Sequence, residues 1–166
     1  MSKRIVLLQA LASMLPDLRL MLYKVDSAAA NRSPAAHEWS ITQVLRHLLD
    51  VETRYQTRLR RVVNEDNPLL PSIHPDAAAH PTAPLPLLLD QFETARTQTL
   101  DFLKELPPGS WQRPAVHETQ GATKLRYLVQ MLVDHDTQHL NQIIEIQQQL
   151  KVIPVAAAQP AIPKPT

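Results

Sequence analysis

The sequence predicts an all-α protein folded as a four-helix bundle. Three observations lead to this fold class. Four runs of about 20–28 residues carry apolar side chains at helical spacing, the prolines cluster between those runs, and no stretch shows the β-branched alternation or hairpin dipeptides typical of strands. The chain has 166 residues, which fits one domain with a substantial core.

The first helical run extends from about residue 3 to residue 24. Its apolar side chains recur every three or four residues at Ile5, Leu8, Leu11, Ala12, Leu15, Leu18 and Leu22. Lys3 and Arg4 precede the apolar stretch, as basic residues do in a secretory signal, but Gln9 interrupts this stretch and we favour an amphipathic helix that stays in the protein. No stretch approaches the roughly 20 apolar residues of a membrane span, so we expect no membrane partner.

The second run begins at the sequence WSITQ and continues for about 23 residues. Ser40 and Gln43 have the spacing of a capping box, in which each side chain bonds to the backbone N–H of the other residue. The apolar stripe that follows comprises Ile41, Val44, Leu48, Val51, Tyr55, Leu59 and Val62. This pattern predicts a long helix with one buried face.

Prolines and turn residues delimit the other two helices. The third begins near residues 84–86, where prolines suit a first turn, and ends at PPG. We expect Thr123 to cap the fourth, which continues through Leu150 and ends before Pro154. The connections at 24–40 and 64–83 are long, so at least one should cross an end of the bundle. We assign residues 1–152 to the bundle and residues 153–166 to an extended or disordered Pro/Ala-rich tail.

Composition restricts the function. Lys and Arg total 17 against 16 Asp and Glu, so the chain lacks the positive excess that neutralises phosphates, and we expect no nucleic-acid partner. Cysteine is absent, which excludes disulfides, thiolate metal ligands and a cysteine nucleophile. This composition is compatible with the reducing cytoplasm, the location that we expect.

Three histidines occupy positions in the apolar stripes of the second and fourth helices. His135 and His139, in the sequence HDTQH, lie four residues apart and can present two imidazole nitrogens to one point about 2 Å from each. His47 lies in the stripe of the second helix and supplies a third candidate ligand. A shared metal ion would satisfy three imidazoles in an apolar interior, where burial without partners is costly. The competing interpretation is a packed helix face with hydrogen-bonded histidines.

Other metal patterns do not fit. The sequence has no Glu-x-x-His, which excludes a ferritin-like di-iron site. HDTQH differs from the HExxH of zinc proteases, because Asp136 replaces the catalytic glutamate, and protease activity is not expected.

Several polar residues could support the ligands from a second layer. Asp50 lies three residues after His47 and so nearest its helix face, whereas Asp136 is about 100° around the helix from His135. The whole candidate set is Asp50, Glu52, Asp134, Asp136 and Gln142. Ordinary surface charge is the competing interpretation for all of them.

Four further histidines and an arginine run lie outside this set. His37 and His117 could each reach a bundle end, and His74 and His80 fall in a Pro/Ala-rich loop that we expect to be solvated. Trp39 should staple the start of the second helix. The run consists of Arg54, Arg58, Arg60 and Arg61. Such a run is usually a solvated face, but an anionic cosubstrate would need one at the mouth of the site.

Two segments, HEWSITQVLRHLLDVE and HETQGATKLRYLVQMLVDHDTQHLNQI, resemble the DinB-like (DinB/YfiT) superfamily of metal-dependent enzymes, and the resemblance spans about residues 1–152. It implies an up-down-down-up bundle, commonly a homodimer, in which His47, His135 and His139 hold a divalent transition metal such as zinc, nickel or iron. It also implies a small-molecule substrate, with low-molecular-weight thiols such as bacillithiol, mycothiol or glutathione as cosubstrates of known members. Lys124 departs from the usual small or apolar residue of the family at the helix start.

Three functional hypotheses follow. The first is a metal-dependent enzyme that catalyses thiol transfer or hydrolysis at an open coordination position. The second is a non-catalytic bundle that binds a metal or small ligand, for example in a stress response. The third is an interaction module whose histidines are buried by hydrogen bonds.

Overall fold

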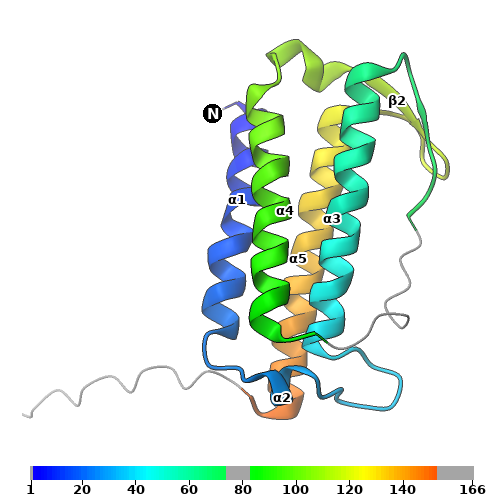
Figure 1. Cartoon of the computed structure of the whole chain (residues 1–166). Coiled ribbons are helices and arrows are strands. Elements are labelled where there is room, and N and C mark those ends of the chain that lie inside the picture. The colour runs from blue at the N-terminus through cyan, green and yellow to red at the C-terminus, as the bar shows by residue number, and fades with distance from the viewer. Residues whose placement is uncertain (1, 74–82, 153–166) are drawn as a thin grey trace, which may run out of the picture.

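Four long helices form the body of the molecule in the computed structural model, which describes residues 2–73 and 83–152 (Figure 1). These helices are α1 (Lys3–Leu22), α3 (Ile41–Asn64), α4 (Leu85–Glu105) and α5 (Leu125–Leu150). Both α1 and α3 pack against α4 and against α5. Because α1 and α5 run in one direction and α3 and α4 in the other, the order is up-down-down-up. The predicted four-helix bundle is therefore confirmed.

The direction of the helices explains the long connections. The connection between α1 and α3 stays at one end of the bundle, contains the short helix α2 (Ser27–Ala30), and crosses that end between diagonally placed helices, as predicted. Since α3 and α4 are parallel, the connection between them starts and finishes at opposite ends of the bundle. Residues 74–82, with His74 and His80, and the predicted tail at 153–166 lie outside the described residues.

Helix α1 buries a slightly different stripe from the one predicted. Its buried residues are Leu7, Leu11, Met14, Leu18 and Leu22. Ile5, expected in the stripe, is 45 % exposed. The stripe advances by four or three residues at each step, so it stays on one face of the helix and meets α4 and α5.

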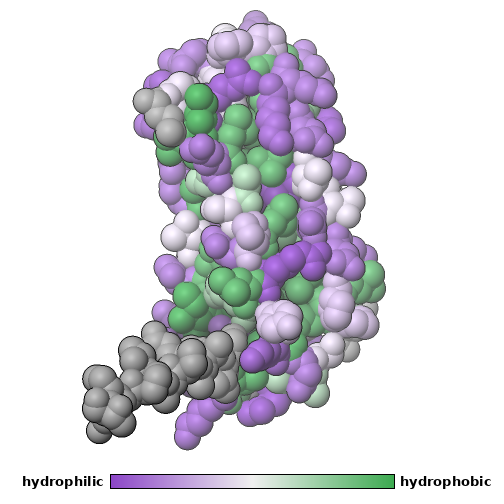
Figure 2. Space-filling model, turned by 90° about the vertical axis from the view of Figure 1, so that its left-hand side faces the viewer, coloured by the Kyte–Doolittle hydropathy of each residue, from purple (hydrophilic) through white to green (hydrophobic). Residues whose placement is uncertain are grey.

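Helix α1 is also long and apolar enough to cross a membrane, with a mean hydropathy of 1.6, so the expectation that no stretch approaches a span was wrong. Length and composition are weak evidence of a span, because core helices pass the same test. On the α1 side of the molecule, hydrophobic patches alternate with hydrophilic ones (Figure 2). Because the buried stripe of α1 packs against two neighbouring helices, we assign it to the bundle.

Helix α3 begins as the sequence predicts. The Ser40 hydroxyl accepts a hydrogen bond from the Gln43 backbone N–H at 3.3 Å, and the Ser40 N–H donates to Gln43 Oε1 at 2.8 Å. All seven predicted stripe residues are buried. This cap therefore fixes the start of the helix two turns before His47.

A small three-stranded sheet, which the sequence analysis did not predict, lies beside α3 (Figure 1). Strand β1 (Leu69–Leu70) pairs in parallel with β2 (Pro114–His117), and β2 pairs antiparallel with β3 (Gly121–Lys124). The 3₁₀ helix η2 (Pro108–Gln112) precedes β2. These strands have two to four residues and include proline, alanine and glycine, so no period-two pattern reveals them.

The sheet also changes the start of α5. Thr123 pairs with Ala115 in the β2–β3 ladder, and the helix begins at Leu125 with no side-chain cap from Lys124. The predicted Thr123 cap is therefore wrong. Gly121 opens β3 with a φ of 74°, a left-handed conformation that glycine adopts without steric strain.

Candidate metal centre

Three histidines from two helices converge on one point. His47 Nε2 lies 2.9 Å from His135 Nε2, which lies 3.1 Å from His139 Nε2. One nitrogen from each ring falls within 4.8 Å of the others. His47 comes from α3, and His135 and His139 come from consecutive turns of α5. The structure therefore brings together the three residues that the sequence singled out.

The chemistry of these nitrogens fits a cation better than mutual hydrogen bonding. A neutral imidazole has one N–H and one lone pair, so His135 Nε2 can hydrogen-bond to one of its two close neighbours but not to both. Three lone pairs directed at a metal remove this conflict. Tetrahedral ligands at about 2.05 Å from zinc lie roughly 3.3 Å apart, close to the observed separations.

Burial keeps the three rings neutral. Desolvation, aided by the neighbouring His139 and opposed by Asp50, lowers the pKa of His47 to about 4. The same desolvation lowers the pKa of His135 to about 3, aided by His139, His47 and Arg96. Desolvation also lowers the pKa of His139, against the effect of Gln142. Neutral imidazole is the form that binds a metal.

Gln142 and Trp39 support this group. Gln142 Oε1 lies 2.7 Å from His139 Nδ1, so it accepts the Nδ1 proton and leaves the Nε2 lone pair directed at the other histidines. The Trp39 ring lies 5.0 Å from the His47 ring and 6.2 Å from the His139 ring, and is nearly parallel to the latter. Trp39 also packs against core residues at this end of the bundle. Trp39 therefore lies directly before the start of α3, and it also contacts two of the candidate ligands, His47 and His139.

A cavity of about 510 Å³ opens onto the three histidines. Its wall includes Val51, Tyr55 and Arg58 from α3, Met131 from α5, and His117 from the end of β2. A second cavity, of about 690 Å³, reaches only His139 among the three, and Trp39 borders both cavities. A small molecule can therefore approach the converging nitrogens.

Of the polar residues expected to support the ligands, some lie near the three histidines and others do not. Gln142 contacts a candidate ligand directly, and Asp50 acts on His47 only through its charge, because its carboxylate accepts a hydrogen bond from Arg54 at 2.9 Å. Asp134 accepts from Gln130. Asp136 and Glu52 are buried and directed away from the histidines toward a common partner on α4.

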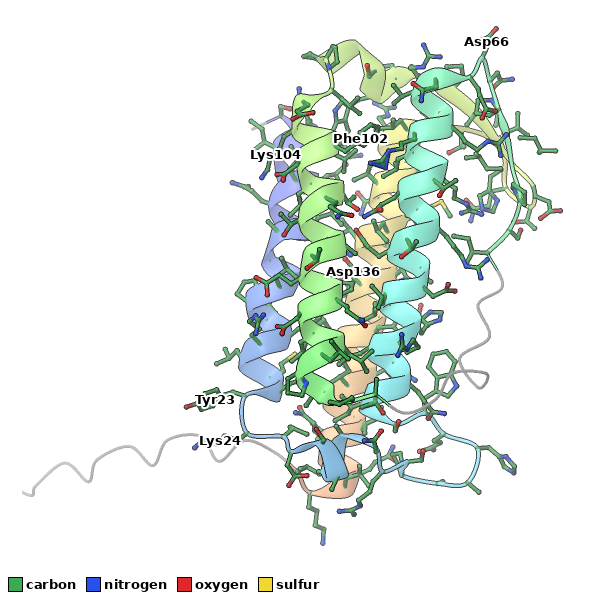
Figure 3. All side chains as sticks on the ribbon, viewed as in Figure 1. Tyr23, Lys24, Asp66, Phe102, Lys104 and Asp136 are labelled. Carbon is green, nitrogen blue, oxygen red and sulfur yellow. The ribbon has the colours of Figure 1, made fainter. Side chains whose placement is uncertain are left out.

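That partner is Arg96, which is fully buried. It donates to Asp136 at 2.6 and 3.1 Å, to Glu52 at 2.8 Å and to the Leu11 carbonyl at 3.1 Å. The Thr99 hydroxyl donates to the other oxygen of Glu52. Figure 3 places Asp136 in the interior between the helices. The network thus joins α4 to both helices that carry the histidines.

Charges within this network oppose the effect of burial. Burial acts to lower the pKa of Arg96, but the charges of Glu52 and Asp136 outweigh it and raise that pKa above its ordinary value. Burial raises the pKa of Asp136, and the Arg96 guanidinium opposes this shift. The charges of Arg96 and Asp136 therefore stabilise each other in the interior.

Sequence analysis did not single out Arg96, although one signal was available. Arg96 lies four residues after Phe92 and three before Thr99, in phase with the buried stripe of α4. A charged residue at a stripe position indicates a buried ion pair. Glu52 gave a similar signal of burial. It directly follows Val51 of the apolar stripe, and the buried face of α3 is wide enough to include both residues.

His37 and His117 line the cavities beside the three histidines. His37 lines the 690 Å³ cavity together with His139, and His117 lines the 510 Å³ cavity. Neither belongs to the converging group.

Comparisons with known proteins agree with this architecture. The model of the DinB superfamily matches residues 9–143. YfiT from Bacillus subtilis, described as a probable metal-dependent hydrolase with an unusual four-helix bundle topology, superposes with a TM-score of 0.79 at 18% identity, over 91% of this chain and 90% of YfiT. A conserved protein from Enterococcus faecalis superposes with a TM-score of 0.65 at 15% identity, over 92% of this chain and 99% of that protein. No curated protein matches the sequence significantly.

Removing the buried cation should strongly destabilise the fold. We expect Arg96→Met to lower the free energy of unfolding by about 3–5 kcal/mol, because Glu52 and Asp136 would stay buried without a countercharge. Urea denaturation measures this loss. As the control, Arg19→Met removes an exposed ion pair with Asp90 and Glu93 and should change stability little. Similar effects of the two substitutions would refute the proposed importance of the network.

Acid should destabilise the metal-free protein through the histidines. Between the ordinary pKa of about 6.5 and the lowered pKa of about 4 at His47, the unfolded chain binds protons that the folded chain excludes. Stability present above about pH 6.5 is therefore lost as the pH falls through this range. Denaturant unfolding at about pH 7 and about pH 5, after chelation, measures the loss.

The His47→Gln/His135→Gln double variant is the comparison for this measurement. It should lose less stability on acidification than the parent, because two of the groups that exclude protons are gone. Asp136 titrates with the opposite sign, since its pKa is raised, but it is present in both proteins. An equal loss in both would contradict the assignment.

Proposed function

The chain belongs to the DinB superfamily, and we propose that it is a metal-dependent enzyme in which His47, His135 and His139 hold a divalent transition ion. The observation that carries this proposal is the convergence of three neutral imidazole nitrogens at the wall of a 510 Å³ cavity. Zinc, nickel and iron all suit a set of three histidines. The description of YfiT as a probable metal-dependent hydrolase supports the same chemistry.

The residues around the three histidines would prepare them for this role. Gln142 orients the His139 ring by accepting its Nδ1 proton. Trp39 packs against two of the rings and limits their rotation. The Arg96 network holds α3 and α5 in register, which keeps His47 opposite His135.

Three protein ligands would leave a coordination position open, and an ion held in this way would lower the pKa of water or of a thiol, so that either could act as a nucleophile near neutral pH. Hydrolysis would use water as the nucleophile, and thiol transfer would use a thiol. The chain has no cysteine, so in thiol transfer a small molecule would supply the thiol. We propose a small-molecule substrate for both reactions, and turnover that requires added thiol would distinguish transfer from hydrolysis.

Location and assembly remain predictions. We propose a cytoplasmic homodimer that acts without nucleic acid or membrane, in keeping with the balanced charge and the absence of cysteine. Size-exclusion chromatography with light scattering would measure the assembly.

Elemental analysis tests the metal site. The untagged protein should contain about one equivalent of a transition metal, and the His135→Ala/His139→Ala variant should contain none, because a single remaining imidazole binds weakly. His37→Ala is the matched control, since His37 lies near His139 but outside the converging group, and it should retain the metal. A parent protein that takes up no zinc, nickel or manganese would refute the proposal.

Loss of the Gln142 contact should weaken the site without abolishing it. Gln142→Ala removes the acceptor that orients His139, and we expect metal affinity to fall by about 10–100-fold. Competition with a chromogenic chelator measures the affinity. Gln138 lies one turn earlier on α5, is exposed and forms no described hydrogen bond with a histidine, so Gln138→Ala should leave the affinity within about twofold of the parent. Equal affinities in all three proteins would show that Gln142 does not support the site.

A further inference from the structure

The 510 Å³ cavity has different chemistry at its two ends. One end holds His47, His135 and His139, and the middle is lined by apolar residues such as Val51, Ile73 and Met131. The far end holds Arg58, His117, Thr119, Ser72 and Tyr55. A ligand that fills this cavity therefore meets the metal centre, an apolar wall and a polar, cationic end.

The arginine run of α3 contributes only one member to this end. Arg54 pairs with Asp50, Arg61 pairs with Glu65, and the guanidinium of Arg60 lies 5.1 Å from the Phe102 ring centroid. Arg58 instead follows His47, Val51 and Tyr55 on the face of the helix that lines the cavity. Its side chain is only 7 % exposed.

Arg58 is a buried cation that forms no ion pair with another residue in the described part of the chain. It donates to the Pro71 carbonyl and lies 5.5 Å from the Tyr55 ring centroid. Within residues 2–73 and 83–152, no carboxylate lies within ion-pair distance of its guanidinium. Burial lowers the pKa of Arg58, and Tyr55 and, to a lesser degree, the charge of Glu118 oppose this shift without reversing it. A buried guanidinium in this state gains most from a carboxylate that it can bind.

His117 supplies a second donor at this end. Its Nδ1 accepts a hydrogen bond from the Thr119 N–H at 3.3 Å, which places the proton of the neutral ring on Nε2. Burial lowers the pKa of His117, so the neutral form prevails near pH 7. The Nε2–H is then available to an anion.

We propose that the Arg58 end of the cavity binds a carboxylate of the substrate, whose reacting group lies at the three histidines. This inference rests on the proposed function and adds a substrate class: an elongated molecule with an anionic end, an apolar middle and a reacting group at the other end. Arg58 lies three helical turns, roughly 16 Å along the axis, from His47. Long side chains at both positions shorten that span, so the substrate has a chain of several carbons between its two ends.

The test uses cobalt(II)-loaded protein and two series of probes. Straight-chain ω-mercaptocarboxylic acids carry a thiol for the metal and a carboxylate for Arg58, and ω-mercaptoalcohols of the same length lack the charge. The thiolate–cobalt absorption band reports binding. At the preferred length, the acid should bind about 10–100-fold more tightly than the alcohol, as expected for a hydrogen bond to a charged group.

Variants assign this preference to Arg58. Arg58→Met should abolish it, Arg58→Lys should retain part of it, and Arg54→Met, one turn earlier on the exposed face, should leave it unchanged. An unaltered cobalt spectrum before thiol addition shows that each variant keeps a folded site. If the parent and Arg58→Met prefer the acid equally, or if neither prefers it, the inference is overturned.

A metal-free arm separates this inference from the proposed function. Calorimetric titration with octanoate should show binding to the parent and to Arg54→Met, and at least tenfold weaker binding to Arg58→Met. If the parent binds octanoate through Arg58 but takes up no cobalt, the carboxylate site stands and the metal proposal fails. If cobalt binds but octanoate binding is absent or independent of Arg58, the metal proposal stands and the carboxylate site fails.

Discussion

The buried guanidinium of Arg96 is the interaction on which the rest of this bundle depends. It lies on α4 and forms charge-assisted hydrogen bonds to Glu52 on α3, to Asp136 on α5 and to a carbonyl of α1. Apolar stripes pack in several registers at small energetic differences, whereas a fully buried ion network tolerates only the arrangement that pairs every charge. The network therefore selects one register for four helices.

The same register brings the three histidines together. Asp136 follows His135 directly, so the two side chains point about 100° apart, one toward Arg96 and the other toward the cavity. On α3, Glu52 lies five residues after His47, about 140° around the helix, so it points toward Arg96 while His47 faces the cavity. A rotation of either helix that broke the ion network would also move a histidine out of the converging group. Stability and site geometry are thus coupled because each of these two helices carries both a member of the ion network and a member of the histidine group.

Sequence periodicity predicted the features that depend only on the spacing of residues along one helix. The capping box at Ser40, the stripe of α3 and the four-residue spacing of His135 and His139 are local patterns, and the structure contains all three. The convergence of His47 with them was predicted because all three occupy stripe positions. Arg96 was missed, because its partners lie 40 or more residues away and no local rule pairs them. The sheet was missed because backbone pairing between distant short segments, not side-chain alternation, forms it.

The two cavities at the histidines differ in which atoms they reach, and this difference indicates the side of approach. The 690 Å³ cavity borders His139 and Gln142 but neither His47 nor His135, so it lies beside the supporting Nδ1 edge of His139. The 510 Å³ cavity borders all three rings. Trp39 stands between the two and packs against His47 and His139. A molecule that reacts at the converging Nε2 atoms therefore approaches through the 510 Å³ cavity, where Arg58 is the one buried cation among the described lining residues.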